Sequence, residues 1–430
     1  MAETPIIPPP LETPGRSSFR IPIDMLLAPD HGWFRALRHS EFRFFWSGNF
    51  VSNIGSWMQN VAQGWLILQL TDSPFWLALV GFAQQIPALF FSLFAGVIAD
   101  RVPRRKMLLF TQSAMMILAL LLAVPAQLHV ISVRQIVVIA FLAGIIMSLN
   151  APTYQAAIRD LVPREDTLNA IALNSIQFNS SRVLGPSFAG FAIAGLGIAA
   201  CFYLNALSYL PLLFVIGRVS FPPHPIREEH SWRGEMVEGF RYVQGHREIL
   251  VLIVLVGMVS MFGLPYLVMM PAFARDVLHV GAAGLGYLVA AAGAGALLGG
   301  VHLARLKPHH HRGPLVLSAT MIFFAAILLF CLSRSPLLST ALLAIAGGAM
   351  VTSVATINSL IQTIVPASLL GRVVSIYMMA YLGLTPLGSL LVGGLAEFVG
   401  TPVAMAMTSG FAFVLTLVIN LTVPSIHRLH

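Results

Sequence analysis

Long apolar runs are the feature that most constrains this chain. Residues 75–99 and 108–124 are almost continuously apolar, and a helix needs about 20 such residues to cross a bilayer. Only 10% of the 430 residues are charged and 57% are hydrophobic, whereas about 25% charged residues are usual in a soluble domain. A membrane β-barrel would show short alternating segments instead. The sequence therefore predicts a helical membrane protein.

Charged and Pro/Gly-rich breaks divide the chain into twelve apolar spans, six on each side of a long interior break. We predict an all-α membrane protein with twelve transmembrane helices in two pseudo-symmetric six-helix bundles. The predicted spans are residues 44–70, 75–99, 107–127, 134–157, 167–193, 197–217, 247–272, 282–304, 314–333, 336–361, 370–396 and 402–424. The predicted domains are an N-terminal tail (1–43), an N-terminal bundle (44–218), a linker with an amphipathic helix (219–246), a C-terminal bundle (247–424) and a tail (425–430).

The two predicted bundles carry a weak internal repeat. An offset of 203 residues superimposes Leu161-Val162-Pro163 on Ile364-Val365-Pro366, Gly185 on Gly388, Gly190 on Gly393 and Gly96 on Gly299. Repeated bundles in parallel orientation are typical of transporters, whose binding site lies between the repeats. The repeat therefore favours a site between the two predicted bundles.

Basic residues predict how the chain crosses the membrane. Of its 25 Lys and Arg residues, 21 fall on one side of the predicted spans and three on the other. Cytoplasmic loops carry the excess of Lys and Arg, so we expect a multi-pass protein of the plasma (inner) membrane with both termini cytoplasmic. The net charge of +8 then reflects topology, and we expect no nucleic-acid partner. The lipid bilayer is the predicted environment, and we expect a monomer.

The loop after the second span combines a glycine, an acid and four bases: Gly96-Val97-Ile98-Ala99-Asp100-Arg101-Val102-Pro103-Arg104-Arg105-Lys106. It resembles the signature of the major facilitator superfamily, G-x-x-x-D-R-x-G-R-R, with Pro103 in place of a glycine. The branch of this family that contains the enterobactin exporter and related drug-efflux proteins has similar segments to three in this chain: Leu161 to Glu165, Glu238 to Tyr242 and Leu370 to Arg372. The resemblance implies a conformational latch in which Asp100 meets the start of span eleven near Gly371; its residues are Gly96, Asp100, Arg101, Arg104, Arg105 and Gly371.

Spans one and five are unusually polar for membrane helices. The stripe on span one steps by three and four residues through Asn49, Asn53, Ser56, Asn60 and Gln63, and span five adds Asn174, Gln177 and Arg182. Polar side chains in a membrane face other helices or water rather than lipid. Hydrogen bonding between helices is one interpretation. The unbroken stripe favours the other, a hydrated substrate pathway.

Arg182 is the only basic residue deep within a predicted span. It lies roughly 22 Å along span five at about 1.5 Å per residue, beyond the middle of the membrane. Two interpretations are open: the side chain snorkels to the nearer interface, or it supplies a positive charge to a cavity. The nearby Gly185, Pro186 and Gly190 are similar to a motif that antiporters of the family carry in this span.

Six further polar or aromatic residues could face a cavity or be packed helix contacts. They are Gln84, Gln85, Tyr266, Asn358, Tyr377 and Tyr381. The tract His309-His310-His311 lacks the ligand spacing of a structural metal site, so we predict a solvated loop and no metal.

No phosphate-binding loop or nucleophile elbow stands in a strand-to-helix setting, so we predict no enzyme activity, no catalytic residues and no cofactor. The leading hypothesis is a secondary active transporter that exports amphipathic small molecules, such as drugs or siderophore-like metabolites, by alternating access. An importer on the same fold and a non-transporting scaffold or receptor are the alternatives. The resemblance implies protons as coupling partner, but none of the 17 Asp and Glu residues lies deep in a span.

Overall fold

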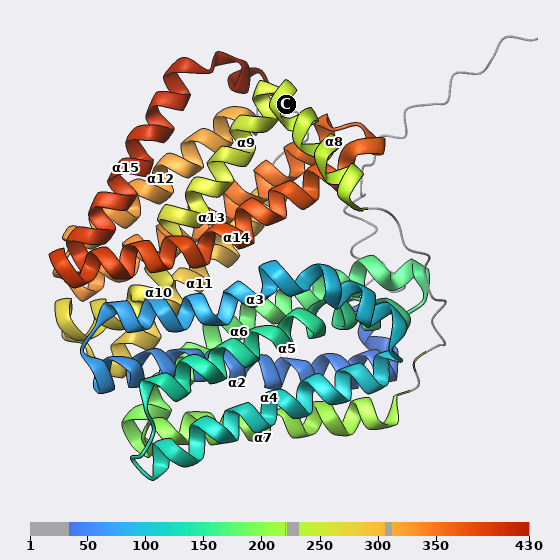
Figure 1. The fold of residues 1–430 in the computed structure, drawn as a ribbon, viewed down its shortest axis with the longest axis vertical. Helices are drawn as coiled ribbons and strands as arrows, with labels where there is room; N and C mark the ends of the chain where they lie inside the picture. The colour runs from blue at the N-terminus through green and yellow to red at the C-terminus, as the bar shows by residue number, and fades with distance from the viewer. Residues whose placement is uncertain (1–33, 220, 222–231, 306–311, 430) are drawn as a thin grey trace, which may run out of the picture.

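The computed structural model describes residues 34–219, 221, 232–305 and 312–429. At residues 92–97, 99, 100 and 232–236 it describes the backbone only. The histidine tract and most of the predicted N-terminal tail lie outside this part of the chain. The first bundle consists of α2 (Ser40–Thr71), α3 (Pro74–Arg101), α4 (Arg104–Gln127), α5 (Val133–Asp160), α6 (Thr167–Leu196) and α7 (Ile198–Arg218). The second bundle consists of α9 (Arg247–Met258), α10 (Pro265–Ala272), α11 (Gly281–Arg305), α12 (Arg312–Leu332), α13 (Pro336–Ile364), α14 (Ala367–Val399) and α15 (Thr401–Thr422). Figure 1 shows the two bundles as separate groups of helices.

The seventh crossing of the membrane is one interrupted helix. Two π-helical segments, η3 (Val259–Gly263) and η4 (Phe273–Val277), flank α10 and continue α9 to the end of the crossing. Ser260 in η3 donates a hydrogen bond to the backbone oxygen of Tyr381, and its hydroxyl lies 2.7 Å from that of Thr385. Since π-helical turns widen a helix locally, they give this span an irregular path that Ser260 ties to α14.

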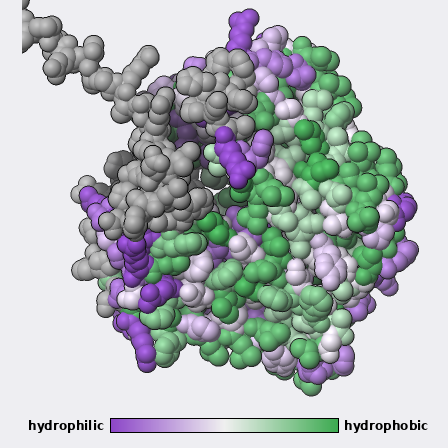
Figure 2. Space-filling view, turned by 180° about the vertical axis from the view of Figure 1, so that it is seen from behind, coloured by the Kyte–Doolittle hydropathy of each residue, from purple (hydrophilic) through white to green (hydrophobic). Residues whose placement is uncertain are grey.

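Two helices differ from the rest in composition. Within the described residues, ten helices are long and apolar enough to cross a membrane, with α9 to η4 counted as one. α2 and α6 span 32 and 30 residues but are not among the ten, because they carry the polar stripes. With these two, the twelve predicted crossings are present, and the predicted fold class is confirmed. Figure 2 shows apolar residues over the middle of one face and hydrophilic residues at its two opposite edges, as a bilayer requires.

The two bundles repeat one plan at the end of the molecule where α2 stops and α3 begins, called here the distal end. Gly197 ends α6 with φ 85°, and Gly400, 203 residues later, ends α14 with φ 82°. This backbone region is open mainly to glycine, so both bundles make the same turn with the same residue. The opposite end, where α2 and α14 begin, is called the linker end because helix α8 (Trp232–Gly245) lies there.

Equivalent helices also join the two bundles. At Gly190 of α6, a Cβ atom would lie 2.8 Å from the Cα of Ala283 in α11 of the other bundle. At Gly393 of α14, a Cβ atom would collide with Ala78 of α3. The repeat in the sequence therefore corresponds to two crossings, α6 with α11 and α14 with α3, that need a glycine for close approach.

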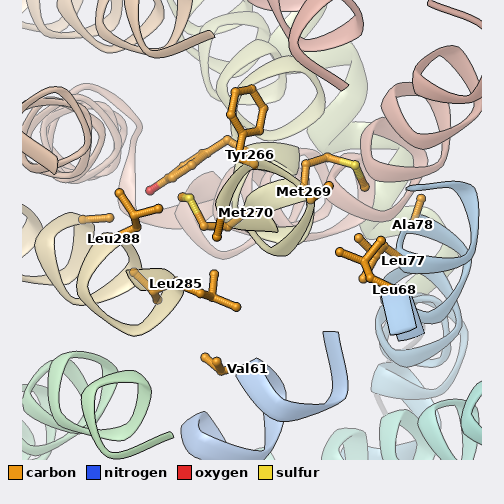
Figure 3. Close-up of a cluster of buried hydrophobic side chains, with 14 of the residues drawn as sticks. Val61, Leu68, Leu77, Ala78, Tyr266, Met269, Met270, Leu285 and Leu288 are labelled. Atoms are coloured by element: carbon orange, nitrogen blue, oxygen red, sulfur yellow. The ribbon is translucent and has the colours of Figure 1, made fainter. Parts of the chain in front are cut away.

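An apolar cluster continues from one bundle to the other near the distal end. Tyr266, Met269 and Met270 of α10 are fully buried, and the cluster that they form includes Leu68 of α2 and Leu285 of α11. Figure 3 shows these side chains together with Leu77, Ala78 and Leu288 around α10. Close van der Waals packing of these side chains stabilises the contact between the bundles at this end.

The linker helix α8 packs on the start of α14. Glu238 forms an ion pair of 2.6 Å with Arg372, and a Cβ atom at Gly239 would lie 3.0 Å from the Cβ of Arg372. The helix lies where the sequence predicts one. Its contact with α14 connects the linker to the second bundle, and the predicted anchoring at the membrane surface stays a prediction.

Candidate functional site

A central cavity of about 480 Å³ lies between the two bundles. Its two walls differ in chemistry. The first bundle contributes all the amide and guanidinium side chains, those of Asn60, Gln63, Gln84, Gln85 and Arg182, together with the aromatic and apolar side chains of Trp57, Ile67, Leu77, Val80, Met147 and Phe178. The second bundle contributes mostly apolar side chains, with two hydroxyl groups among them: Leu264, Leu267, Val268, Tyr381, Leu382 and Thr385. The cavity therefore has its amide and arginine side chains on one wall, called here the polar wall, and none on the opposite wall, called here the apolar wall.

A second cavity of about 180 Å³ lies within the first bundle and borders the same part of α2. Its walls include the predicted stripe residues Asn49, Asn53, Ser56, Asn60 and Gln63. It also holds the polar side chains of Gln112 in α4, Asn150 in α5 and Asn205 in α7. Six residues line both cavities: Trp57, Asn60, Gln63, Gln84, Met147 and Phe178. The polar stripe of α2 thus runs past both spaces.

Part of the stripe also bonds to neighbouring helices. The Asn49 amide donates to the side-chain oxygen of Gln177 over 3.2 Å. The Ser56 hydroxyl donates to the backbone oxygen of Ser52 over 3.0 Å and lies 3.2 Å from the hydroxyl of Tyr209. Both interpretations of the stripe therefore apply. Asn49 and Ser56 form hydrogen bonds and border the smaller cavity, whereas Asn60 and Gln63 face the central cavity.

Arg182 borders the central cavity, which decides between its two predicted orientations. The Cζ atom of Arg182 lies 5.9 Å from the centre of the Trp57 ring, within the range of a cation–π contact. The ring of Trp57 in turn meets Phe178 edge to face at 6.0 Å, and both aromatic residues line the cavity. The guanidinium thus rests against an aromatic wall instead of extending to the membrane interface.

The remaining pathway candidates divide into one cavity residue and several packed ones. Tyr381 lines the central cavity. Tyr377 is buried and donates to the backbone oxygen of Val354 over 3.3 Å, and Tyr266 is fully buried beside Phe323. Asn174 accepts a bond of 2.8 Å from the Tyr154 hydroxyl, and Asn358 accepts one of 3.2 Å from Gln362. Together with Gln177, these four residues border neither cavity.

Polar contacts close the distal end of the central cavity. Arg275 of the second bundle bonds to the Asp72 carboxylate over 2.7 Å and to the backbone oxygen of Leu68 over 2.8 Å. The Ser73 hydroxyl donates to the carboxylate of Glu397 over 2.8 Å. Asp72 and Arg275 are 203 residues apart, so they occupy equivalent positions of the repeat. These contacts and the apolar cluster hold the two bundles together at this end.

The predicted latch lies at the linker end. The surroundings of Gly96 and the side chain of Asp100 are outside the part of the chain that the structure describes, and Arg101 is exposed. Arg104 forms an ion pair with Asp160 of α5, and Arg105 donates to the backbone oxygen of Gly217 in α7. A Cβ atom at Gly371 would meet no atom within 4 Å. The two arginines thus hold helices of the first bundle, and the contact of Asp100 with α14 stays a prediction.

The glycines of the antiporter-like motif hold α6 in place. A Cβ atom at Gly185 would lie 2.5 Å from the Cβ of Trp57 and 2.8 Å from the backbone oxygen of Ile54 in α2. Pro186 stands within α6, and Gly190 faces the other bundle at Ala283. The motif therefore sets how closely α6 approaches α2, and so where Trp57 and Arg182 lie.

Several wall residues were not predicted. Trp57 lies next to the polar stripe of α2, and its position three residues before Asn60 was a usable signal. Asn150, Asn205 and Gln112 are amide residues in mostly apolar helices. Such residues are rarely exposed to lipid, so each could have been assigned to the interior of a bundle.

Twelve membrane helices in two repeated bundles around a central cavity define a secondary transporter of the major facilitator superfamily. A family model described as MFS_3, transmembrane secretion effector, matches residues 31–429. The chain belongs to this family. The predicted recognition and the prediction that the chain is a transporter, not an enzyme, are confirmed.

Curated relatives and solved structures support this assignment. The chain is 29% identical over 387 residues to proteins named enterobactin exporter EntS from Shigella boydii serotype 4 (strain Sb227) and Escherichia coli O1:K1 / APEC, covering 90% of this chain and 92% of theirs. Its fold is similar to that of a bacterial homologue of the human lysosomal transporter Spinster (TM-score 0.67, 16% identity, 91% and 96% coverage). It is also similar to the nucleoside transporter NupG (TM-score 0.69, 12% identity, 89% and 98% coverage).

Proposed function

We propose that this protein exports amphipathic small molecules of the siderophore class by alternating access, acting as a monomer in the plasma membrane. The observation that carries the proposal is the central cavity, with one polar and one apolar wall. Such a cavity suits a molecule that has a hydrogen-bonding side and an apolar side. The name of the relatives, enterobactin exporter, supports both the direction and the class of substrate.

The charge distribution supports a cytoplasmic linker end. If the linker end is cytoplasmic, as the excess of Lys and Arg indicates, the distal contacts of Arg275, Ser73 and the α10 cluster close the cavity toward the outside. These are the contacts expected of a state that is closed toward the outside. Export requires these contacts to break while the linker ends of the bundles approach each other.

Orientation is tested by labelling introduced cysteines in intact cells. Cysteines at Arg164 and Arg334, both exposed and at opposite ends, should react from opposite sides with a membrane-impermeant maleimide. We expect the cysteine at position 334 to react in intact cells and the cysteine at position 164 only after permeabilisation. The native Cys201 and Cys331 are buried and provide the background. The opposite labelling pattern would contradict the proposed orientation.

Transport is tested with purified protein in lipid vesicles. Enterobactin should accumulate in vesicles whose protein has its linker end outward, and accumulation should stop when both Asp72 and Arg275 are replaced by cysteines and oxidised to a disulfide. Reduction should restore it, which controls for misfolding. Enterobactin movement equal to that in protein-free vesicles would contradict the proposed function, and uptake only through distal-end-outward protein would indicate an importer.

A further inference from the structure

We propose that the central cavity selects organic anions that carry an aromatic ring, with Arg182 and Trp57 as the subsite for the charge and the ring. The proposal rests on the proposed function for the location of the substrate, and it adds a charge class that neither the fold nor the relatives assign.

Arg182 is a cation that the protein itself leaves partly unsatisfied. Its Nε atom is buried and has no hydrogen-bond partner among the described residues. A guanidinium offers five donors in a planar fork that suits a carboxylate or another planar oxyanion. An unpaired charge away from water is unfavourable, so an anion in the cavity would supply the missing acceptor.

The cavity wall supplies no negative charge in return. Among the described residues, neither cavity is lined by a carboxylate, and the carboxylates of Asp72, Asp276 and Glu397 take part in contacts at the distal end. The amides of Asn60, Gln63 and Gln84 provide dipoles but no net charge. The cavity thus carries an uncompensated positive charge, which attracts anions and repels cations of the same shape.

The aromatic part of the ligand has its own surface. Trp57 and Phe178 form an edge-to-face pair on the same wall as Arg182, and Leu267 and Val268 lie across the cavity on α10. A ring placed beside Trp57 would lie between these two walls with its anionic group on Arg182. This arrangement favours an aromatic acid over an aliphatic acid of the same charge.

The charge of the cavity also predicts how export is driven. The described cavity walls hold no carboxylate that could carry a proton inward as the anion leaves. Each cycle would then move net negative charge out of the cell, a step that a negative interior favours. The transporter would work on the membrane potential rather than on a pH gradient.

Two dyes that share the xanthene ring separate charge from shape: fluorescein, an anion at pH 8, and rhodamine 123, a cation. We expect purified protein to bind fluorescein at least about tenfold more tightly than rhodamine 123 in anisotropy titrations, because charge-assisted bonds to arginine are strong. Arg182→Gln should remove the preference, and Arg182→Lys should keep part of it. Arg334→Gln removes an arginine charge at the distal end and should change nothing.

Measuring binding and transport separately distinguishes failure of the anion subsite from failure of the proposed export function. Equal binding of both dyes, or a fluorescein preference that survives in Arg182→Gln, would overturn the anion subsite. A preference in binding with no enterobactin flux would leave the subsite standing and contradict export.

In vesicles, fluorescein flux should follow a potassium diffusion potential set with valinomycin. Flux that responds to a pH gradient and not to the potential would overturn the charge movement and indicate proton exchange.

Discussion

The two bundles share one scaffold but build opposite walls. Both end a helix at a glycine with positive φ, Gly197 and Gly400, and both join the other bundle through a glycine, Gly190 and Gly393. Facing the cavity, however, the first bundle supplies all the amides and the arginine, whereas the second supplies mostly apolar side chains with two hydroxyl groups, and Thr385 stands 203 residues after Arg182. The repeat therefore preserves the close crossings between the bundles, whereas the side chains that line the cavity differ.

This difference explains the composition of the helices. α2 and α6 are too polar to qualify as ordinary membrane spans, and both belong to the first bundle. Their equivalents in the second bundle are the interrupted α9–η4 span, which is highly apolar, and α14. Substitutions at equivalent joints should therefore have equal effects, and substitutions in the two walls should not.

The largest effect is expected at the joints. Gly190→Val and Gly393→Val should each lower enterobactin flux roughly 10- to 100-fold, because overpacking a close helix crossing costs about 1 to 3 kcal/mol. Gly394→Val is the matched control, since a Cβ atom there would meet no atom within 4 Å. Vesicle flux and size-exclusion profiles separate transport from misfolding. A much larger effect at one joint than at the other would show that the repeat does not extend to function.

The latch should act in one bundle only. Asp100→Asn should reduce flux roughly 5- to 30-fold, because a carboxylate near a helix N-terminus contributes about 1 to 2 kcal/mol at most. The equivalent position in the second bundle is Leu303, where an acid is absent, and Leu303→Asn should have little effect. Flux and expression are measured together. Wild-type flux in Asp100→Asn would show that the loop serves only to set the orientation of the chain in the membrane.

The polar wall should contribute binding of its own. Gln84→Leu should raise the KM for enterobactin roughly 3- to 10-fold, the effect of losing one neutral hydrogen bond. Gln127→Leu, the same change at the distal end of α4, serves as control because Gln127 borders neither cavity. An unchanged KM in Gln84→Leu would place the substrate nearer the apolar wall.

The smallest effect concerns the distal ion pair. Asp72→Asn removes the ion pair with Arg275, so a cysteine placed at the buried Leu285 should be labelled roughly 1.5- to 5-fold faster. The effect should be small because the Asp72 side chain is 84% exposed and exposed ion pairs contribute little. Asp276→Asn removes a partner of Arg275 from the same bundle and should leave the labelling rate unchanged. Equal acceleration in both variants would mean that Arg275 acts within its own bundle.

Local patterns in the sequence were sufficient for the helices and for one wall. Each span is a run of apolar residues that any bilayer forces into a helix, and the stripe from Asn53 to Gln63 keeps one face through helical spacing alone. The depth of Arg182 likewise follows from counting residues. The direction in which its side chain points cannot be predicted in this way. A snorkelling side chain and one that faces the cavity start from the same backbone position and differ only in the neighbours that they contact.

Contacts between distant residues could not be predicted in this way. Asp72 and Arg275 are separated by 203 residues, and nothing local distinguishes either from an ordinary loop charge. Tyr377 and Tyr381 lie one helical turn apart, yet one is packed against Val354 and the other borders the cavity. The choice depends on the rotation of α14 against its neighbours.

By itself, the sequence determined that this protein crosses a membrane twelve times and carries polar residues and one arginine within it, because the bilayer acts on each helix separately. The tertiary structure decided which of those residues face a common cavity, that Trp57 supports Arg182, and which end of the molecule is closed. Those features arise from packing between helices, where a glycine such as Gly190 or Gly393 sets the distance of approach and the repeat brings Asp72 and Arg275 together.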